Sequence, residues 1–251
     1  MLVIALWATF AVCATAAVIA RVKGRVRLGF GVRAPGLARE IIAGLAITAA
    51  AITAIFVVEL ATGSLRVDSA GLHADVLGRG AAVLLPWAMF EELLLRCGVL
   101  VGLLALTRSP WVAVAGSSLV FGLAHVAGGD ATLLSAISNT MGGVMYAVAF
   151  VRTGRVWMPV ALHFAWNFVQ GPVFGFPVSG ETELNGTSII GGLVHVTENG
   201  PDWLTGGTYG PEGGVLSLAA RALVITLVVI ATRNTSDDRA LLRRPVPAAT
   251  A

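Results

Sequence analysis

Seven hydrophobic runs separated by polar segments dominate the pattern of the sequence. Each is long enough, or nearly so, to cross about 30 Å of hydrocarbon as a helix. We expect membrane helices at residues 2–20, 41–61, 81–104, 111–127, 132–151, 156–174 and 215–232. The fourth run is short, and the fifth is diluted by serine, asparagine and threonine, which are expected to face the bundle interior. The pattern predicts an all-α, polytopic membrane bundle of about seven transmembrane helices with a polar site inside it.

The composition supports an integral membrane protein. Hydrophobic residues make up 56% of the 251 residues and charged residues only 12%, about half of the roughly 25% found in soluble proteins. Mean hydropathy is +0.83. The length fits a single transmembrane helical domain, residues 1–232, followed by a polar, Pro- and Ala-rich tail, residues 233–251, that we expect to be cytoplasmic and disordered.

Basic residues divide unequally between the two sets of connections. Thirteen lie in the connections and tail on one side of the predicted bundle and two, Arg66 and Arg79, on the other. The positive-inside rule then places the N-terminus outside and the C-terminus in the cytoplasm of a cell membrane. No basic residue precedes the first run, and several follow it, so this run is typical of an uncleaved signal anchor. The net charge of +3 therefore indicates topology, and nucleic acid is not an expected partner.

The segment 175–214 is too long for an ordinary connection, so it forms either a cap over the bundle or a disordered loop. His195 within it and His73 in the 62–80 loop are expected to be solvated. Arg221 lies early in the last run and is expected to extend toward the membrane interface.

Three charged residues, Glu91, Glu92 and Arg96, lie within the run at 81–104. One charge at bilayer depth costs roughly 2.5–3.5 kcal/mol on insertion scales, so each needs a reason. Glu92 and Arg96 are four residues apart, with the acid first, and can pair on one helix face. Glu91 lies about 100° around the helix and is left free for chemistry. The alternative is that Arg96 merely neutralises one glutamate for packing, which leaves the other carboxylate unexplained.

Two further polar pairs have four-residue spacing within predicted spans, Phe121 with His125 and His163 with Asn167. A single histidine in a span is more often a hydrogen-bonding partner of another helix. Gathered with the carboxylates, however, these side chains would form a buried polar cavity. A carboxylate and a histidine can activate water, and a second histidine with an amide can stabilise an oxyanion.

Motifs of other hydrolases are absent from the sequence. There is no Gly-x-Ser-x-Gly elbow, no Gly-Asp pair within a span and no His-Glu-x-x-His. Cys13 and Cys97 both lie in apolar runs and can form neither a disulfide framework nor a cysteine metal site.

Three short motifs of this sequence together resemble those of the CPBP intramembrane protease family. They are Glu-Glu-x-x-x-Arg at 91–96, Phe-x-x-x-His at 121–125 and His-x-x-x-Asn at 163–167. The family includes the CAAX prenyl endopeptidases and Abi-type bacterial proteins. The similarity covers roughly residues 81–170. It implies a membrane-embedded endopeptidase without a cofactor that acts on a membrane protein or peptide. The family roles carried over by motif are water activation by Glu91 and His125, orientation of the site by Glu92 and Arg96, and oxyanion stabilisation by His163 and Asn167. Family members often have Gly where this chain has Cys97, and the resemblance names no substrate.

Three alternatives remain at this point. Glu91, His125 and His163 could bind zinc and leave a fourth position open. The chain could instead be a non-catalytic scaffold or bacteriocin-immunity protein, or a transporter or proton channel. The predicted span boundaries also raise a difficulty. At about 1.5 Å per residue, Glu91 lies roughly 15 Å below the outer face and His125 only a few ångströms below it, so the spans must tilt or the boundaries must shift.

Overall fold

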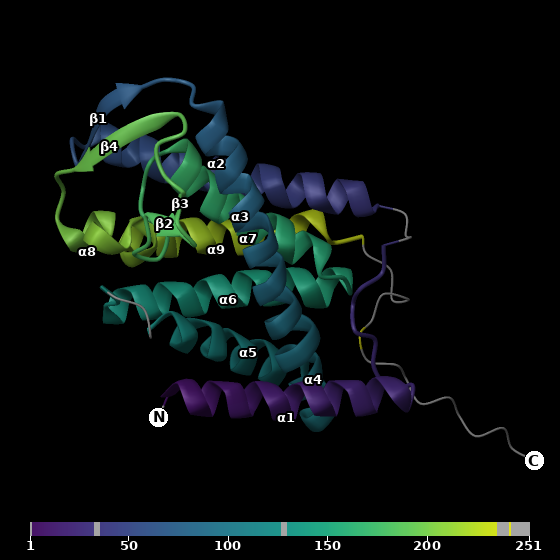
Figure 1. The fold of residues 1–251 in the computed structure, drawn as a ribbon. Helices are drawn as coiled ribbons and strands as arrows, with labels where there is room; N and C mark the ends of the chain where they lie inside the picture. Colours follow the sequence, from purple (N-terminus) through teal and green to yellow (C-terminus); the bar gives the residue numbers. More distant parts are fainter. Residues whose placement is uncertain (1, 33–35, 127–129, 235–240, 242–251) are drawn as a thin grey trace, which may run out of the picture.

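The chain folds mostly into helices in the computed structural model (Figure 1), which describes residues 2–32, 36–126, 130–234 and 241. Each predicted hydrophobic run is helical. The first two runs form α1 (Leu2–Val22) and α2 (Leu37–Ala61). The third forms α3 (Ala74–Glu92), the π-helix η1 (Leu93–Leu100) and α4 (Val101–Thr107) in direct succession. The last four form α5 (Pro110–His125), α6 (Leu133–Thr153), α7 (Trp157–Phe168) with the π-helix η2 (Val169–Val173), and α9 (Val215–Ala231).

Three of these helices, α1, α2 and α6, are long and apolar enough to cross a membrane, among the residues that the structure describes. The helices α5 and α9 are apolar but shorter. Large hydrophobic side chains are exposed along α1 and α2, among them Ile4, Trp7 and Ile42. An apolar surface of this extent is typical of helices that face lipid.

Glycines allow the helices of the bundle to approach closely. The helix α6 packs against α5, α7 and α9, while α1 packs against η1 and α4. A Cβ added at Gly143 would come within 2.7 Å of Ser118 Cα, so α5 and α6 can touch here only through glycine. A Cβ at Gly102 would overlap the carbonyl group of Cys13. Gly98 and Gly102 thus form a small-xxx-small surface on which α1 lies.

The 175–214 segment is an ordered cap in the structure. Its strand β4 (Val194–Glu198) pairs antiparallel with β1 (Leu65–Ala70), and β2 (Glu183–Leu184) pairs with β3 (Thr187–Ser188). Three short helices, α8 (Asp202–Thr205), η3 (Gly207–Tyr209) and η4 (Pro211–Gly213), return the chain to α9. These strands are the only departure from an all-α fold among the described residues. His73 and His195, expected to be solvated, are both exposed here.

The prediction that Arg221 extends to the membrane interface is wrong. Arg221 is 1% exposed, and its guanidinium donates to Glu212 at 2.9 Å, to Ser138 at 2.7 Å and to Asn139 at 3.2 Å. It also lies 4.5 Å from the ring centre of Trp166. A buried cation requires such partners. The counter-ion, Glu212, lies in the cap, so the spacing of residues within a helix could not predict this pair.

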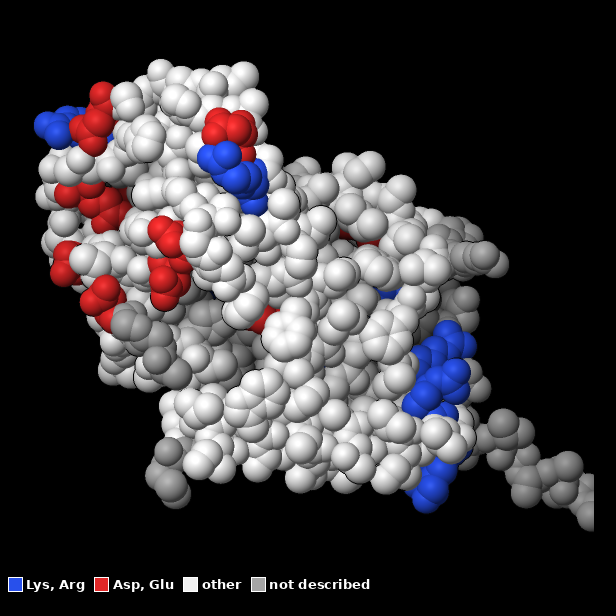
Figure 2. Space-filling model, in the orientation of Figure 1, with Lys and Arg blue, Asp and Glu red and all other residues white. Residues whose placement is uncertain are grey.

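Charges gather at the two ends of the molecule in Figure 2. Acidic side chains lie mostly around the cap, and basic side chains lie at the end where the connection from α1 to α2 runs. The basic Arg66 and Arg79 near the cap are each paired with an aspartate, Asp68 and Asp75. The wide band between the two ends is almost free of charge (Figure 2), as expected for a surface in contact with lipid.

Candidate active site

The predicted pair of Glu92 and Arg96 forms at the junction of α3 and η1. Arg96 Nε donates to Glu92 Oε2 at 2.8 Å, and both residues are 0% exposed. The π-helix begins directly after Glu92 and includes Arg96. Insertions of π-helix occur frequently at functional sites. Arg96 also donates to Ser117 of α5 at 3.3 Å, so the pair connects two helices of the bundle.

The second oxygen of Glu92 binds His163 of α7. His163 Nδ1 lies 3.0 Å from Glu92 Oε1. A carboxylate that already accepts from Arg96 is ionised and can only accept, so the Nδ1–H of His163 must be the donor. The other ring nitrogen, Nε2, then faces the neighbouring Glu91, whose Oε2 lies 3.9 Å away. Glu92 thereby determines the orientation of this ring and keeps Nδ1 protonated.

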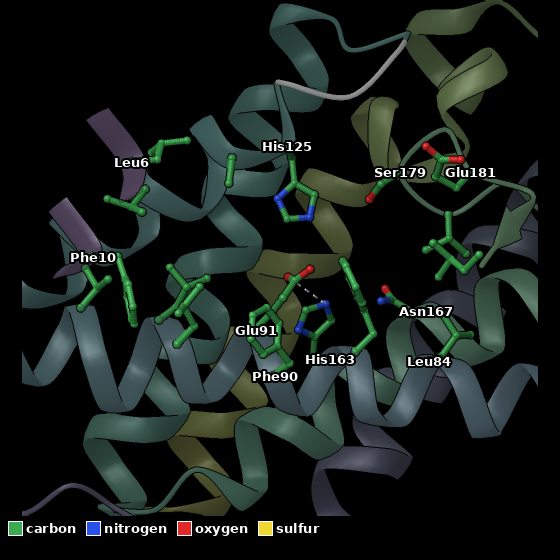
Figure 3. A pocket seen from close by; sticks show the side chains of 18 of the residues that line it. Leu6, Phe10, Leu84, Phe90, Glu91, His125, His163, Asn167, Ser179 and Glu181 are labelled. Atoms are coloured by element: carbon green, nitrogen blue, oxygen red, sulfur yellow. Dashed lines mark ion pairs between the residues drawn. The ribbon is translucent and has the colours of Figure 1, made fainter. Parts of the chain in front are cut away.

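Glu91 occupies the position predicted for a free carboxylate. It pairs with no Arg or Lys among the described residues, and its side chain is 17% exposed. Figure 3 shows its carboxylate pointing into a cavity, between the imidazoles of His163 and His125. His125 Nδ1 lies 2.8 Å from the carbonyl oxygen of Phe121, which can only accept, so Nδ1 carries the proton. In neutral His125 the lone pair is therefore on Nε2.

Aromatic rings hold both imidazoles in place. The ring of Tyr146 stacks on His163 with centroids 4.7 Å apart and an interplanar angle of 14°. Phe121 lies 4.4 Å from the ring of His125 and 5.7 Å from that of His163. Phe121, the first residue of its motif, is thus a packing residue shared by both histidines. The role of Tyr146 was missed by sequence reasoning, although it is one of only two tyrosines and lies in a predicted span.

The cavity beside these residues has a volume of about 500 Å³. Glu91, His125, His163 and Asn167 line it, whereas Glu92 and Arg96 lie behind its wall. The structure therefore brings four of the six predicted residues to one cavity, and the other two support them. Glu91 and His125 line the same cavity although α3 starts at Ala74 and α5 ends at His125, so the depths calculated from the predicted span boundaries do not hold.

The fit to a metal ion can be examined at the same residues. Within the described part of the chain, no group of three or more His, Cys, Asp and Glu side chains is arranged to hold a metal ion. Glu91, His125 and His163 share the cavity without converging as three ligands.

Comparison with known proteins identifies the central part of the chain. Residues 73–169 match the family model described as type II CAAX prenyl endopeptidase Rce1-like. The resemblance to CAAX proteases is confirmed. No curated protein and no solved structure matches the chain.

The Rce1-like segment extends from His73 to Val169 and includes all six predicted site residues. Because this family is a protease family, the match supports a CAAX-type intramembrane protease function. The helix α1, the cap and α9 lie outside the matched segment, yet parts of α1 and of the cap line the same cavity.

Proposed function

We propose that the protein is an intramembrane endopeptidase that cleaves a peptide bond with a water molecule activated by Glu91 and His125. The observation that carries the proposal is that Glu91, a carboxylate that pairs with no Arg or Lys among the described residues, points into the cavity between two imidazoles (Figure 3). An ionised carboxylate in an apolar membrane bundle costs free energy. If Glu91 served only to pack helices together, we would expect it to be paired with an arginine or a lysine.

The proposed reaction follows from the positions of the hydrogen-bonding groups. A water molecule held by Glu91 and by Nε2 of His125 gives its proton to Glu91 as its oxygen attacks the carbonyl carbon of the substrate. The oxyanion that forms accepts hydrogen bonds from His163 Nε2–H and from the amide of Asn167. The C–N bond then breaks, and the proton taken from water passes to the leaving amine.

This role for His163 requires the imidazolium form, because Nδ1–H is already used by Glu92. Charge balance supports that form. Glu91 and Glu92 carry two negative charges against one positive charge on Arg96, and a proton on His163 makes the group neutral. Buried charges are tolerated when they are compensated in this way. Glu92 and Arg96 therefore act as positioning residues.

We further infer the placement in the membrane. Residues 1–232 form one domain that crosses the cell membrane about seven times, with the N-terminus outside and the C-terminus in the cytoplasm. The unequal division of basic residues and the apolar band between the charged ends support this topology. The tail from residue 233 lies almost entirely outside the described residues. The partners are the bilayer and a membrane protein or peptide substrate, and neither nucleic acid nor a cofactor is required.

The proposal is tested by comparing the membrane peptidomes of cells that express the wild-type protein and the Glu91→Ala variant. We expect cleavage fragments that occur only with the wild type, and the same fragments after exhaustive chelation. Identical peptidomes would favour a non-catalytic scaffold, and loss of the fragments on chelation would favour zinc catalysis.

A further inference from the structure

The two ends of the cavity differ in character, and parts of the chain outside the Rce1-like segment contribute to both. Figure 3 shows Leu6 and Phe10 of α1 at one end, Ser179 and Glu181 of the cap at the other, and Glu91 and His163 between them. A substrate that reaches the catalytic groups can therefore contact both ends at once. The matched segment supplies the chemistry, and the flanking parts are positioned to select the substrate.

The end formed by α1 is apolar. Leu6, Trp7 and Phe10 line the cavity together with Phe90 and Leu94 of the third hydrophobic run. Only hydrophobic substrate groups can replace water there without losing hydrogen bonds. This end accepts an apolar stretch of peptide.

The cap end carries a carboxylate that has no counter-charge. Glu181 lines the cavity, is exposed, and forms no ion pair with any described residue. The whole segment 175–214 contains no Lys or Arg. Another acidic group of the cap, Glu212, is already neutralised by Arg221 at 2.9 Å.

The same ion pair fixes the part of the cap that bears Glu181. Glu212 Oε2 accepts from the backbone N–H of Ser179 at 2.9 Å and from its hydroxyl at 2.7 Å. The backbone of Glu181 exchanges hydrogen bonds with Val178 at 2.8 and 2.9 Å. Glu181 is thus held at the cavity rim by a turn that is anchored to a buried arginine of α9.

Asn167 provides a second and independent sign that a ligand binds between the two ends. Its side chain lines the cavity, the residue is only 7% exposed, and its amide has no hydrogen-bond partner among the described residues. Because polar groups in protein interiors are nearly always hydrogen-bonded, an amide that opens into the cavity is available to a bound ligand. Figure 3 places Asn167 between His163 and the turn that carries Glu181. Its donor and acceptor suit a peptide group of a chain that extends from the catalytic residues toward Glu181.

We propose that the substrate is a peptide with an apolar stretch against α1 and a Lys or Arg side chain facing Glu181, with the cleaved bond between them. The position of the cleaved bond rests on the proposed function. The preference for binding a basic side chain at Glu181 does not depend on whether the peptide is cleaved. Glu181 determines specificity and takes no part in bond cleavage.

The test uses full-length protein in lipid nanodiscs and synthetic peptides that share a leucine- and alanine-rich stretch and differ at one following position, which is Lys, Gln or Glu. Binding is measured with the Glu91→Gln variant, so that cleavage does not interfere. We expect the Lys peptide to bind roughly three- to tenfold more tightly than the Glu peptide, the scale of one partly exposed ion pair and one like-charge contact. Adding Glu181→Gln should remove this preference, and adding Glu181→Lys should reverse it. Glu183→Gln, a matched change of an exposed cap carboxylate that does not line the cavity, should leave the preference as it is.

Equal binding of the Lys and Glu peptides, or a preference that survives Glu181→Lys, would overturn the inference. Cleavage of the same peptides by the protein with intact Glu91 is measured separately. A Lys preference in binding that Glu181→Lys reverses, together with no cleavage of any peptide, would support the subsite and count against the proposed function.

Discussion

His163 donates its Nδ1–H to Glu92 over 3.0 Å, while Arg96 donates to the other oxygen of the same carboxylate over 2.8 Å. Glu92 thus neutralises a fully buried arginine and at the same time fixes a histidine that lines the cavity. Its two tasks can be separated by mutation, because one concerns folding and the other the orientation and charge of an imidazole.

Glu92→Gln leaves Arg96 uncompensated, which can cost about 3–5 kcal/mol. We expect a lower yield of folded protein in the membrane, measured by fluorescence-detected size exclusion. The double variant Glu92→Leu with Arg96→Met should recover yield, because an apolar pair can replace a buried ion pair. It should still lose about 10²–10³-fold in cleavage, the scale of one oxyanion donor. Wild-type yield for Glu92→Gln would refute the pairing, and full activity of the double variant would refute the support of His163.

The contact of α1 with Gly102 gives a second prediction. A Cβ at Gly102 would meet backbone atoms of Cys13, which cannot rotate away, whereas a Cβ at Gly78 would meet nothing within 4 Å. Gly102→Ala should destabilise the protein by about 1–3 kcal/mol or more and displace α1 from the cavity. The matched control Gly78→Ala should be neutral or stabilising by up to about 1 kcal/mol. Thermal unfolding in detergent measures both, and equal midpoints for the two variants would contradict the packing.

The helices and the Glu92–Arg96 pair could be predicted from the sequence because both depend on local spacing. Apolar runs determine where a membrane helix forms, and four-residue spacing brings two side chains to one face. The partners of Arg221, the stacking of Tyr146 on His163 and the approach of the cap to the cavity depend on residues far apart in the chain. The spacing of residues along the sequence carries no information about contacts between segments that are far apart in the chain. The snorkelling prediction for Arg221 failed for that reason, since its counter-ion Glu212 lies in an irregular segment.

Because of the carboxyl group of Glu198, we expect the stability of the cap to depend on pH. Loss of hydration on burial raises the pKa of this carboxyl to about 7; a hydrogen bond with Thr205 lowers it, and the charge of Asp202 raises it. Glu59 of α2 is a further acid near it. The folded state therefore holds a proton that the unfolded chain, with an ordinary glutamate, releases near pH 4.5. Stability from this group is fully present below that pH and is lost as pH rises toward 7.

Hydrogen exchange of the paired strands β1 and β4, measured at several pH values, tests this. Protection should fall between about pH 4.5 and 7 in the wild type. Glu198→Gln, which mimics the protonated form, should flatten that fall, and Glu183→Gln, a change of an exposed cap residue, should not. Protection that rises over the same pH range would contradict the predicted loss of cap stability with rising pH.

The topology can be measured with reporters. We expect a reporter fused after Thr232 to be active only in the cytoplasm and one inserted between residues 180 and 210 to be active only outside, because basic residues divide thirteen to two. The opposite result at either position would reverse the orientation and move the cap, with its acidic side chains, to the cytoplasmic side.

The paired action of Glu91 and His125 can be examined in a double-mutant cycle. If both hold the same water molecule, His125→Ala should reduce cleavage about as much as Glu91→Gln. The double variant should lose little beyond either single variant, because residues that act as a unit are not additive. Losses that multiply would indicate that the two residues act in separate steps.

The most direct test of the account is the cleavage rate of the Glu91→Gln variant relative to the wild type, measured on a substrate identified from the peptidomes. The substitution keeps the shape of the side chain and removes the base, so the variant should fold and unfold like the wild type. We expect its rate to fall by about 10²–10⁴-fold, the usual contribution of a general base. A folded Glu91→Gln protein that keeps more than about a tenth of the wild-type rate would contradict the assignment of Glu91 as the base.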